Sequence, residues 1–164
     1  MAESKYTGVI GALLNHRFSH VRQTLRSLRE AGLIPGRRQG DITARHIGDI
    51  VLALTAPTFP GAPDHVHRLR CLTLRSAADA PATVGHLLHA LVDTLPSSPV
   101  LGDLDLDDGW LGISADCVEL ECLSLTGKRA VVRYGAEDAQ PSSPITRVPL
   151  NGLRKLATAI EKLT

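Results

Sequence analysis

The stretch SHVRQTLRSLREAGLI, residues 19 to 34, separates apolar from basic side chains at helical spacing. One face of the predicted helix carries the apolar side chains Val21, Leu25 and Leu28. Another face carries basic side chains that recur at spacings of four and three: Arg22, Arg26 and Arg29. Ser19 is the predicted N-cap and Gly32 the predicted end. The pattern predicts a helix with a buried face and a cationic strip, with His20 and Gln23 beside that strip.

Composition narrows the fold class. The chain has 164 residues, enough for one domain or two small ones, and 43% of them are hydrophobic but only 3% aromatic. A core of Leu, Val, Ile and Ala suits helices with a modest sheet better than an aromatic-rich β-sandwich. The net charge is only +1, yet residues 1–54 hold eight Lys and Arg against four Asp and Glu. This asymmetry indicates that the first part of the chain meets a polyanion.

Helical spacing recurs outside the opening stretch. Further helices are predicted over 4–15, 42–55 (with Thr43 as its cap), 83–95 and 150–163. Residues 65–75 fit neither the helical nor the strand period, and 96–109 is expected to be an acidic loop. Alternating runs predict three strands of an antiparallel meander, at 110–115, 117–125 and 129–135.

These elements predict an α+β protein with two domains. Residues 1–57 are expected to form a helix-turn-helix domain, and 62–164 a small domain in which two helices cover the meander. The proline-rich segment 56–64 is interpreted as the hinge. The break HRF at 16–18 joins two helices as in helix-turn-helix proteins, whose second helix enters the DNA major groove.

The pattern Ser-x-Val-x-x-x-Leu-x-x-Leu-x-x-x-Gly-Leu-Ile, from Ser19 to Ile34, resembles the recognition helix of winged helix-turn-helix regulators of the MarR and ArsR type. The resemblance covers residues 4–45, about a quarter of the chain. It implies a basic wing, for which PGRRQGD at 35–41 would supply Arg37 and Arg38. The loop, however, runs into a helix rather than a second wing strand. Residues 29–56 are also similar to uncharacterised proteins of alphaproteobacterial prophages.

The predicted function is therefore sequence-specific binding of double-stranded DNA by a prophage-type transcription regulator that forms a homodimer. The predicted DNA-binding residues are Ser19, His20, Arg22, Gln23, Arg26, Arg29, Arg37 and Arg38. Two alternatives stay open: a viral DNA-packaging subunit of the small-terminase type that assembles into a ring, and a protein–protein adaptor whose basic helix docks an acidic partner. The second domain would oligomerise or bind a protein partner.

Other site types lack support in the sequence. No phosphate-binding loop or catalytic motif is present, so no enzyme activity and no cofactor are expected. A metal site is not expected either, because the spacing of the candidate ligands fits no known pattern: His65, His67, Cys71, His86 and His89. The three cysteines, without a CxxC pair, signal peptide or long apolar run, predict a reduced bacterial cytoplasm (nucleoid-associated) with no membrane contact, and thiols packed in the core.

Overall fold

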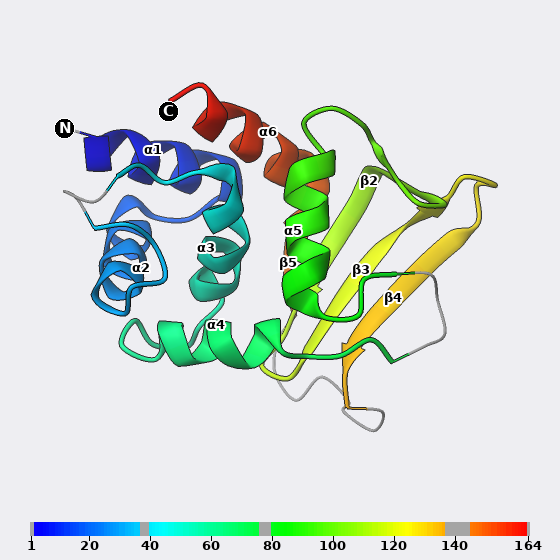
Figure 1. Cartoon of the computed structure of the whole chain (residues 1–164), viewed down its shortest axis with the longest axis horizontal. Helices are drawn as coiled ribbons and strands as arrows, with labels where there is room; N and C mark the ends of the chain where they lie inside the picture. Colours follow the sequence, from blue (N-terminus) through cyan, green and yellow to red (C-terminus); the bar gives the residue numbers. More distant parts are fainter. Residues whose placement is uncertain (1, 37–39, 76–79, 137–144, 164) are drawn as a thin grey trace.

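Helices and one antiparallel sheet build the chain, as the predicted α+β class requires (Figure 1). The computed structural model describes residues 2–36, 40–75, 80–136 and 145–163. Its helices are α1 (Ala2–Leu14), α2 (Phe18–Glu30), the short 3₁₀ helix η1 (Ala44–His46), α3 (Ile47–Leu54), α4 (Ala62–Arg70), α5 (Val84–Thr94) and α6 (Leu150–Glu161). Its strands are β1 (Val100–Leu101), β2 (Leu104–Ile113), β3 (Cys117–Ser124), β4 (Arg129–Gly135) and β5 (Thr146–Pro149).

The predicted helices are confirmed. Capping explains where two of them begin: Thr43 precedes η1, and Thr83 precedes α5 with its hydroxyl accepting the His86 N–H at 3.3 Å. The ambiguous segment is helix α4, which starts with Pro63 in its first turn, where a missing N–H costs nothing. α4 packs on α2 and α3, so the proline-rich segment before it connects neighbouring helices. The division of the chain into domains at 57 and 62 stays a prediction.

The predicted meander is the centre of a larger sheet. β2, β3 and β4 pair in that order, and β1 and β5 add to different parts of β2. The prediction of an acidic loop over 96–109 was wrong for the second half of that range, because β2 already begins at Leu104. Leu104 and Leu106 are buried while Asp107 is exposed, so this is a strand whose acidic residues face solvent.

Helices α5 and α6 pack against the sheet, and α6 also packs against α1 (Figure 1). The approach of α6 to α1 is close, since a Cβ on Gly152 would lie 3.2 Å from the Leu13 carbonyl oxygen. Buried apolar side chains therefore run continuously from the N-terminal helices to the sheet. None of the described helices has the length and hydropathy that a bilayer crossing would require.

The cysteines follow the prediction in part. Cys117 and Cys122 are buried among apolar side chains, as expected. Cys71 is exposed, contrary to expectation, because it is the C-cap residue of α4 and lies beyond the buried face of that helix.

Candidate nucleic-acid interface

The start of α2 differs from the prediction. Arg17 is the N-cap residue, with an extended backbone, and no side chain caps the helix. Ser19 therefore already lies in the first helical turn, where its helical backbone directs its side chain away from the capping position. It is exposed. The predicted N-cap was wrong by two residues.

The end of α2 is the one predicted. Gly32 has φ +73°, a left-handed conformation that glycine adopts without strain. Its N–H donates to the Arg29 carbonyl at 3.0 Å, and the Leu33 N–H donates to the Leu28 carbonyl at 2.9 Å. These two bonds form a Schellman motif, which satisfies the last carbonyls of the helix and fixes its length.

The break between α1 and α2 is tight. Asn15 has φ 56°, and the His16 N–H donates to the Gly11 carbonyl at 2.9 Å. A Cβ on Gly11 would lie only 2.9 Å from the His16 carbonyl oxygen and 3.8 Å from a methyl group of Val21. The absence of a side chain at Gly11 therefore allows the turn and α2 to pack directly on α1.

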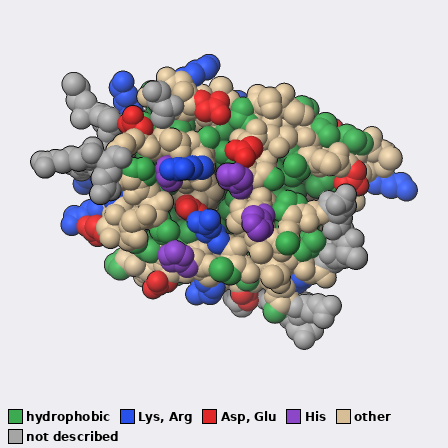
Figure 2. Space-filling model, viewed as in Figure 1, with side chains coloured by type: hydrophobic (Ala, Val, Ile, Leu, Met, Phe, Trp, Pro, Cys, Tyr) green, Lys and Arg blue, Asp and Glu red, His purple; other side chains and the backbone are tan. Residues whose placement is uncertain are grey.

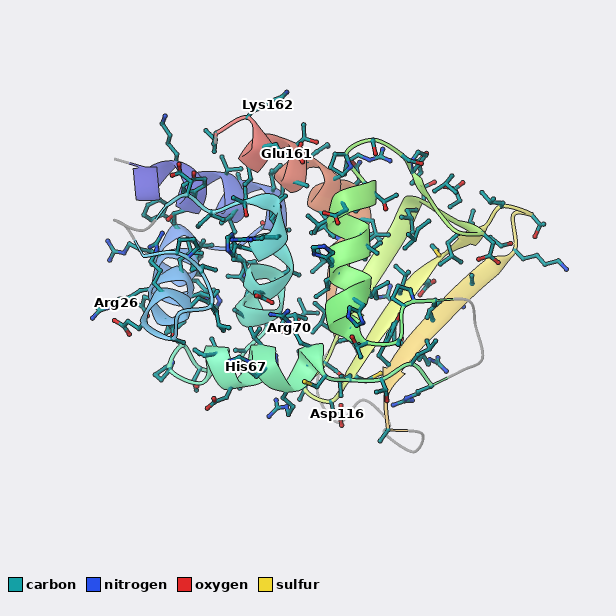
Figure 3. The ribbon with its side chains drawn as sticks, viewed as in Figure 1. Arg26, His67, Arg70, Asp116, Glu161 and Lys162 are labelled. Atoms are coloured by element: carbon teal, nitrogen blue, oxygen red, sulfur yellow. The ribbon has the colours of Figure 1, made fainter. Side chains whose placement is uncertain are left out.

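The two faces of α2 separate as the sequence predicts. Its apolar face is fully buried, at 0% exposure for each of Val21, Leu25 and Leu28. Its outer face exposes Arg22, Gln23 and Arg26, and Arg29 is half-buried beside them. In Figure 3 Arg26 projects from α2 at the edge of the molecule. Because the apolar face anchors the helix, the exposed side chains project together from a fixed surface, which we call the α2 strip (Arg22, Gln23, Arg26 and Arg29).

Two arginines of the α2 strip, Arg22 and Arg26, are at most weakly engaged by ion pairs. Arg26 Nε lies 2.8 Å from Glu30 Oε1, but both side chains are mostly exposed, at 78% and 63%. An exposed pair one helical turn apart contributes only about 0.3–0.5 kcal/mol, so Arg26 is easily transferred to another anion. In the part of the chain that the structure describes, no ion pair involves Arg22.

A hollow of about 550 Å³ runs beside the α2 strip, and its far wall is formed by Phe59 and Pro60 from the connection between α3 and α4. The Ser27 hydroxyl donates to the Phe59 carbonyl at 2.6 Å and holds this connection against α2. Sequence reasoning missed Phe59 and Pro60, because three prolines in nine residues are typical of a linker. No local signal shows that such a segment folds back onto a helix.

His20 is turned away from the α2 strip. Its ring stacks on His16 at 5.2 Å between centroids and meets the Phe59 ring edge-on at 5.0 Å. Burial, together with the charge of His20, lowers the pKa of His16. His20 thus helps to hold the α3–α4 connection in place, whereas the strip beside it faces solvent.

The predicted wing residues, Arg37 and Arg38, lie outside the described residues. The described residues on either side of them, 35–36 and 40–43, form no strand. Of the histidines considered as metal ligands, His65 is buried and its Nε2 lies 3.0 Å from the Thr55 hydroxyl. Within the described ranges, no three His, Cys, Asp or Glu side chains are grouped so that they could hold a metal ion.

Comparison with known proteins does not assign the chain to a family. No protein-family model, no curated protein and no solved structure matches this chain.

Proposed function

We propose that the chain is a sequence-specific DNA-binding protein that inserts α2 into the major groove. The observation that carries the proposal is the pairing of a fully buried face of α2 with an outer face that exposes Arg22, Gln23 and Arg26. α2 has 13 residues, a length of roughly 20 Å. A helix of this size, held rigidly from behind, suits groove insertion.

The side chains of the α2 strip are those that read bases and bind phosphates. Arg22 and Arg26 have the forked donors that match guanine edges or phosphate oxygens, and Gln23 can pair with an adenine edge. Arg29, and Arg37 and Arg38 from the loop after α2, would hold the DNA backbone. The surrounding charge favours this partner, because residues 1–75 hold eleven Lys and Arg against five Asp and Glu.

In this proposal α1 and α2 act as a helix-turn-helix pair, with Asn15 and Gly11 forming the tight turn between them. The protein would be a prophage-type transcription regulator in the bacterial nucleoid. A homodimer would place two α2 helices about one DNA turn apart and give a palindromic binding site.

Replacement of both exposed arginines tests the proposal. An Arg22→Ala/Arg26→Ala variant should bind its duplex target at least about 30-fold more weakly, because each lost contact costs about 1–3 kcal/mol. The slope of log affinity against log salt should fall by about two. An Arg147→Ala/Lys155→Ala variant removes two exposed charges from β5 and α6 and should bind as the wild type does. Fluorescence anisotropy on selected duplexes measures both quantities.

Three outcomes would contradict the proposal in different ways. Equal DNA affinity of the Arg22→Ala/Arg26→Ala variant and the wild type at equal salt would exclude the α2 strip as the interface. A closed ring in mass photometry would indicate a packaging subunit rather than a dimeric regulator. No binding to genomic DNA fragments at low salt would indicate that the α2 strip docks an acidic protein.

A further inference from the structure

A second basic surface lies where η1, α3, α4 and α5 converge. A hollow of about 420 Å³ opens there, and its polar lining is Arg45, Asp49, Arg70, Thr83, His86 and His89. Figure 2 shows basic and histidine side chains gathered near the middle of this face, and Figure 3 places Arg70 between the ends of the helices. These residues are separate from the α2 strip, so binding in this hollow does not require that α2 bind DNA.

One glycine lets two helices meet closely beside this hollow. A Cβ on Gly48 of α3 would lie 3.0 Å from the Cβ of Leu88 on α5, so a larger residue would push the two helices apart. A Cβ on Gly85 would be in ordinary van der Waals contact, 3.5 Å from the Nε of Arg70, so the Arg70 side chain lies close over the first turn of α5. Arg45, Arg70 and the two histidines of α5 therefore face one space.

The hollow carries more positive than negative charge. Among the described residues that line it, Asp49 is the only acidic one, and Arg70 Nη1 donates to Asp49 Oδ2 at 3.1 Å. Burial raises the pKa of the Asp49 carboxyl, although Arg70 and His67 oppose this effect. Arg45 is exposed, and among the described residues no ion pair involves it. The first turn of α5, which contains His86, adds the positive end of the helix dipole.

We infer that this hollow binds a phosphate group, held by Arg45 and Arg70 with His86 at the start of α5. Guanidinium groups bind phosphate through paired, charge-assisted hydrogen bonds, and a hollow of this volume accommodates the group with a small organic substituent. Arg70 uses one of its donors on Asp49 and keeps others for the ligand. Asp49 opposes an anion in the hollow, so it limits the affinity of the site.

The test titrates the full-length chain with three probes: inorganic phosphate, adenosine monophosphate and duplex DNA, each at fixed ionic strength. Arg45→Ala should weaken binding of a phosphate-bearing probe by about tenfold, the loss of one charge-assisted contact. Asp49→Asn, which removes the negative charge and keeps the shape, should tighten the same binding several-fold. Arg147 of β5 is exposed and does not line the hollow, so Arg147→Ala should leave the binding of the small phosphate probes unchanged.

The probes identify the source of the phosphate. If Arg45→Ala weakens binding of the two small probes, the natural ligand is a free phosphate or phosphomonoester. If it weakens binding of DNA alone, the phosphate belongs to the nucleic-acid backbone. The inference is overturned if Arg45→Ala leaves all three probes unaffected, or if Asp49→Asn and Arg45→Ala change binding in the same direction. Unchanged thermal unfolding of Arg45→Ala without ligand confirms that the variant is folded, as its exposure leads us to expect.

Discussion

The arginines of α2 and those of β4 lie in different electrostatic surroundings. On the solvent side of the sheet, Arg133 of β4 stands directly across from Glu119 of β3, with Nε and Oε1 2.8 Å apart. Arg129 of β4 similarly reaches Glu121 of β3 at 3.0 Å. On α2, Arg22 has no such partner among the described residues, and Arg26 shares only a surface contact with its own helix. Both α2 and β4 expose arginines, but those of β4 are paired with carboxylates of β3, whereas Arg22 and Arg26 of α2 are available to a ligand.

This difference shows why counts of basic residues are a poor guide to binding. Strand pairing supplies Arg129 and Arg133 of β4 with carboxylates from β3, and such cross-strand pairs contribute to stability. The helix supplies its partners only from the same chain segment, one turn away. The two parts of the chain also differ in net charge. Residues 1–75 have a surplus of basic residues, whereas residues 76–164 hold seven Lys and Arg against twelve Asp and Glu.

The largest effect is expected from the buried face that fixes the α2 strip. Leu25 is 0% exposed, so Leu25→Ala should lower the free energy of unfolding by about 3 kcal/mol through lost burial and a residual cavity. Leu125, in the turn after β3, is 59% exposed. Leu125→Ala should change the stability by less than about 0.5 kcal/mol. Urea denaturation measures both, and similar losses would mean that α2 is not anchored as described.

The next largest effect concerns alkaline pH and the sheet. Burial, with nearby carboxylates, raises the pKa of Cys122 from 9.0 to about 11. The unfolded chain therefore loses this proton first, and stability present below pH 9 is lost as the pH rises towards 11.

The loss attributable to Cys122 should be about 2 kcal/mol. Cys122→Ala should flatten the fall in unfolding free energy over this range, whereas Cys71→Ala, at an exposed thiol, should leave it unchanged. A fall of the same size in both variants would exclude Cys122 as the cause and leave Tyr134, whose pKa burial raises to about 12.

A smaller effect is expected at the end of α2. Gly32→Ala places a side chain at φ +73° and should cost about 1 kcal/mol, because only the backbone conformation is strained and no atom lies within 4 Å of the added Cβ. Gly8→Ala, inside α1 with equally open surroundings, should instead stabilise the protein by about 0.5–1 kcal/mol. Thermal unfolding of the two variants distinguishes the signs. Stabilisation by Gly32→Ala would exclude the Schellman ending.

The smallest effect tests the opening comparison directly. Arg133→Ala should lower the unfolding free energy by about 0.5 kcal/mol, since it removes a cross-strand pair. Arg22→Ala should change it by no more than a few tenths of a kcal/mol, since no described ion pair is lost. Equal losses in denaturant titrations would show that the α2 arginine is also engaged in holding the fold.

Sequence periodicity predicted the elements whose burial is one-sided. α2, α5 and the β2–β3–β4 meander each place apolar residues at the spacing of their own geometry, so local pattern was sufficient. Prediction from periodicity failed where an acidic composition hid the alternation of apolar residues. Leu104 and Leu106 alternate with aspartates, a strand pattern that was interpreted as an acidic loop. β5 has only four residues and depends on its pairing with β2, which no local pattern reveals.

The candidate sites divide in the same way. The α2 strip could be predicted because Arg22, Gln23 and Arg26 belong to one helix. The hollow lined by Arg45 and Arg70 could not, because its residues come from separate segments that only tertiary packing brings together. Close approach at Gly48 makes that packing possible, and a lone glycine in a helix gives no sign of its partner.

The packing of α6 on α1 and the pairing of β5 with β2 have a consequence for synthesis. α1 is translated before β5 and α6, which supply the surfaces that complete the sheet and cover α1. Until residues 146–161 emerge, the nascent chain exposes apolar side chains that have no cover. We therefore expect ribosome-stalled chains that end before residue 146 to bind chaperones and to resist proteases poorly.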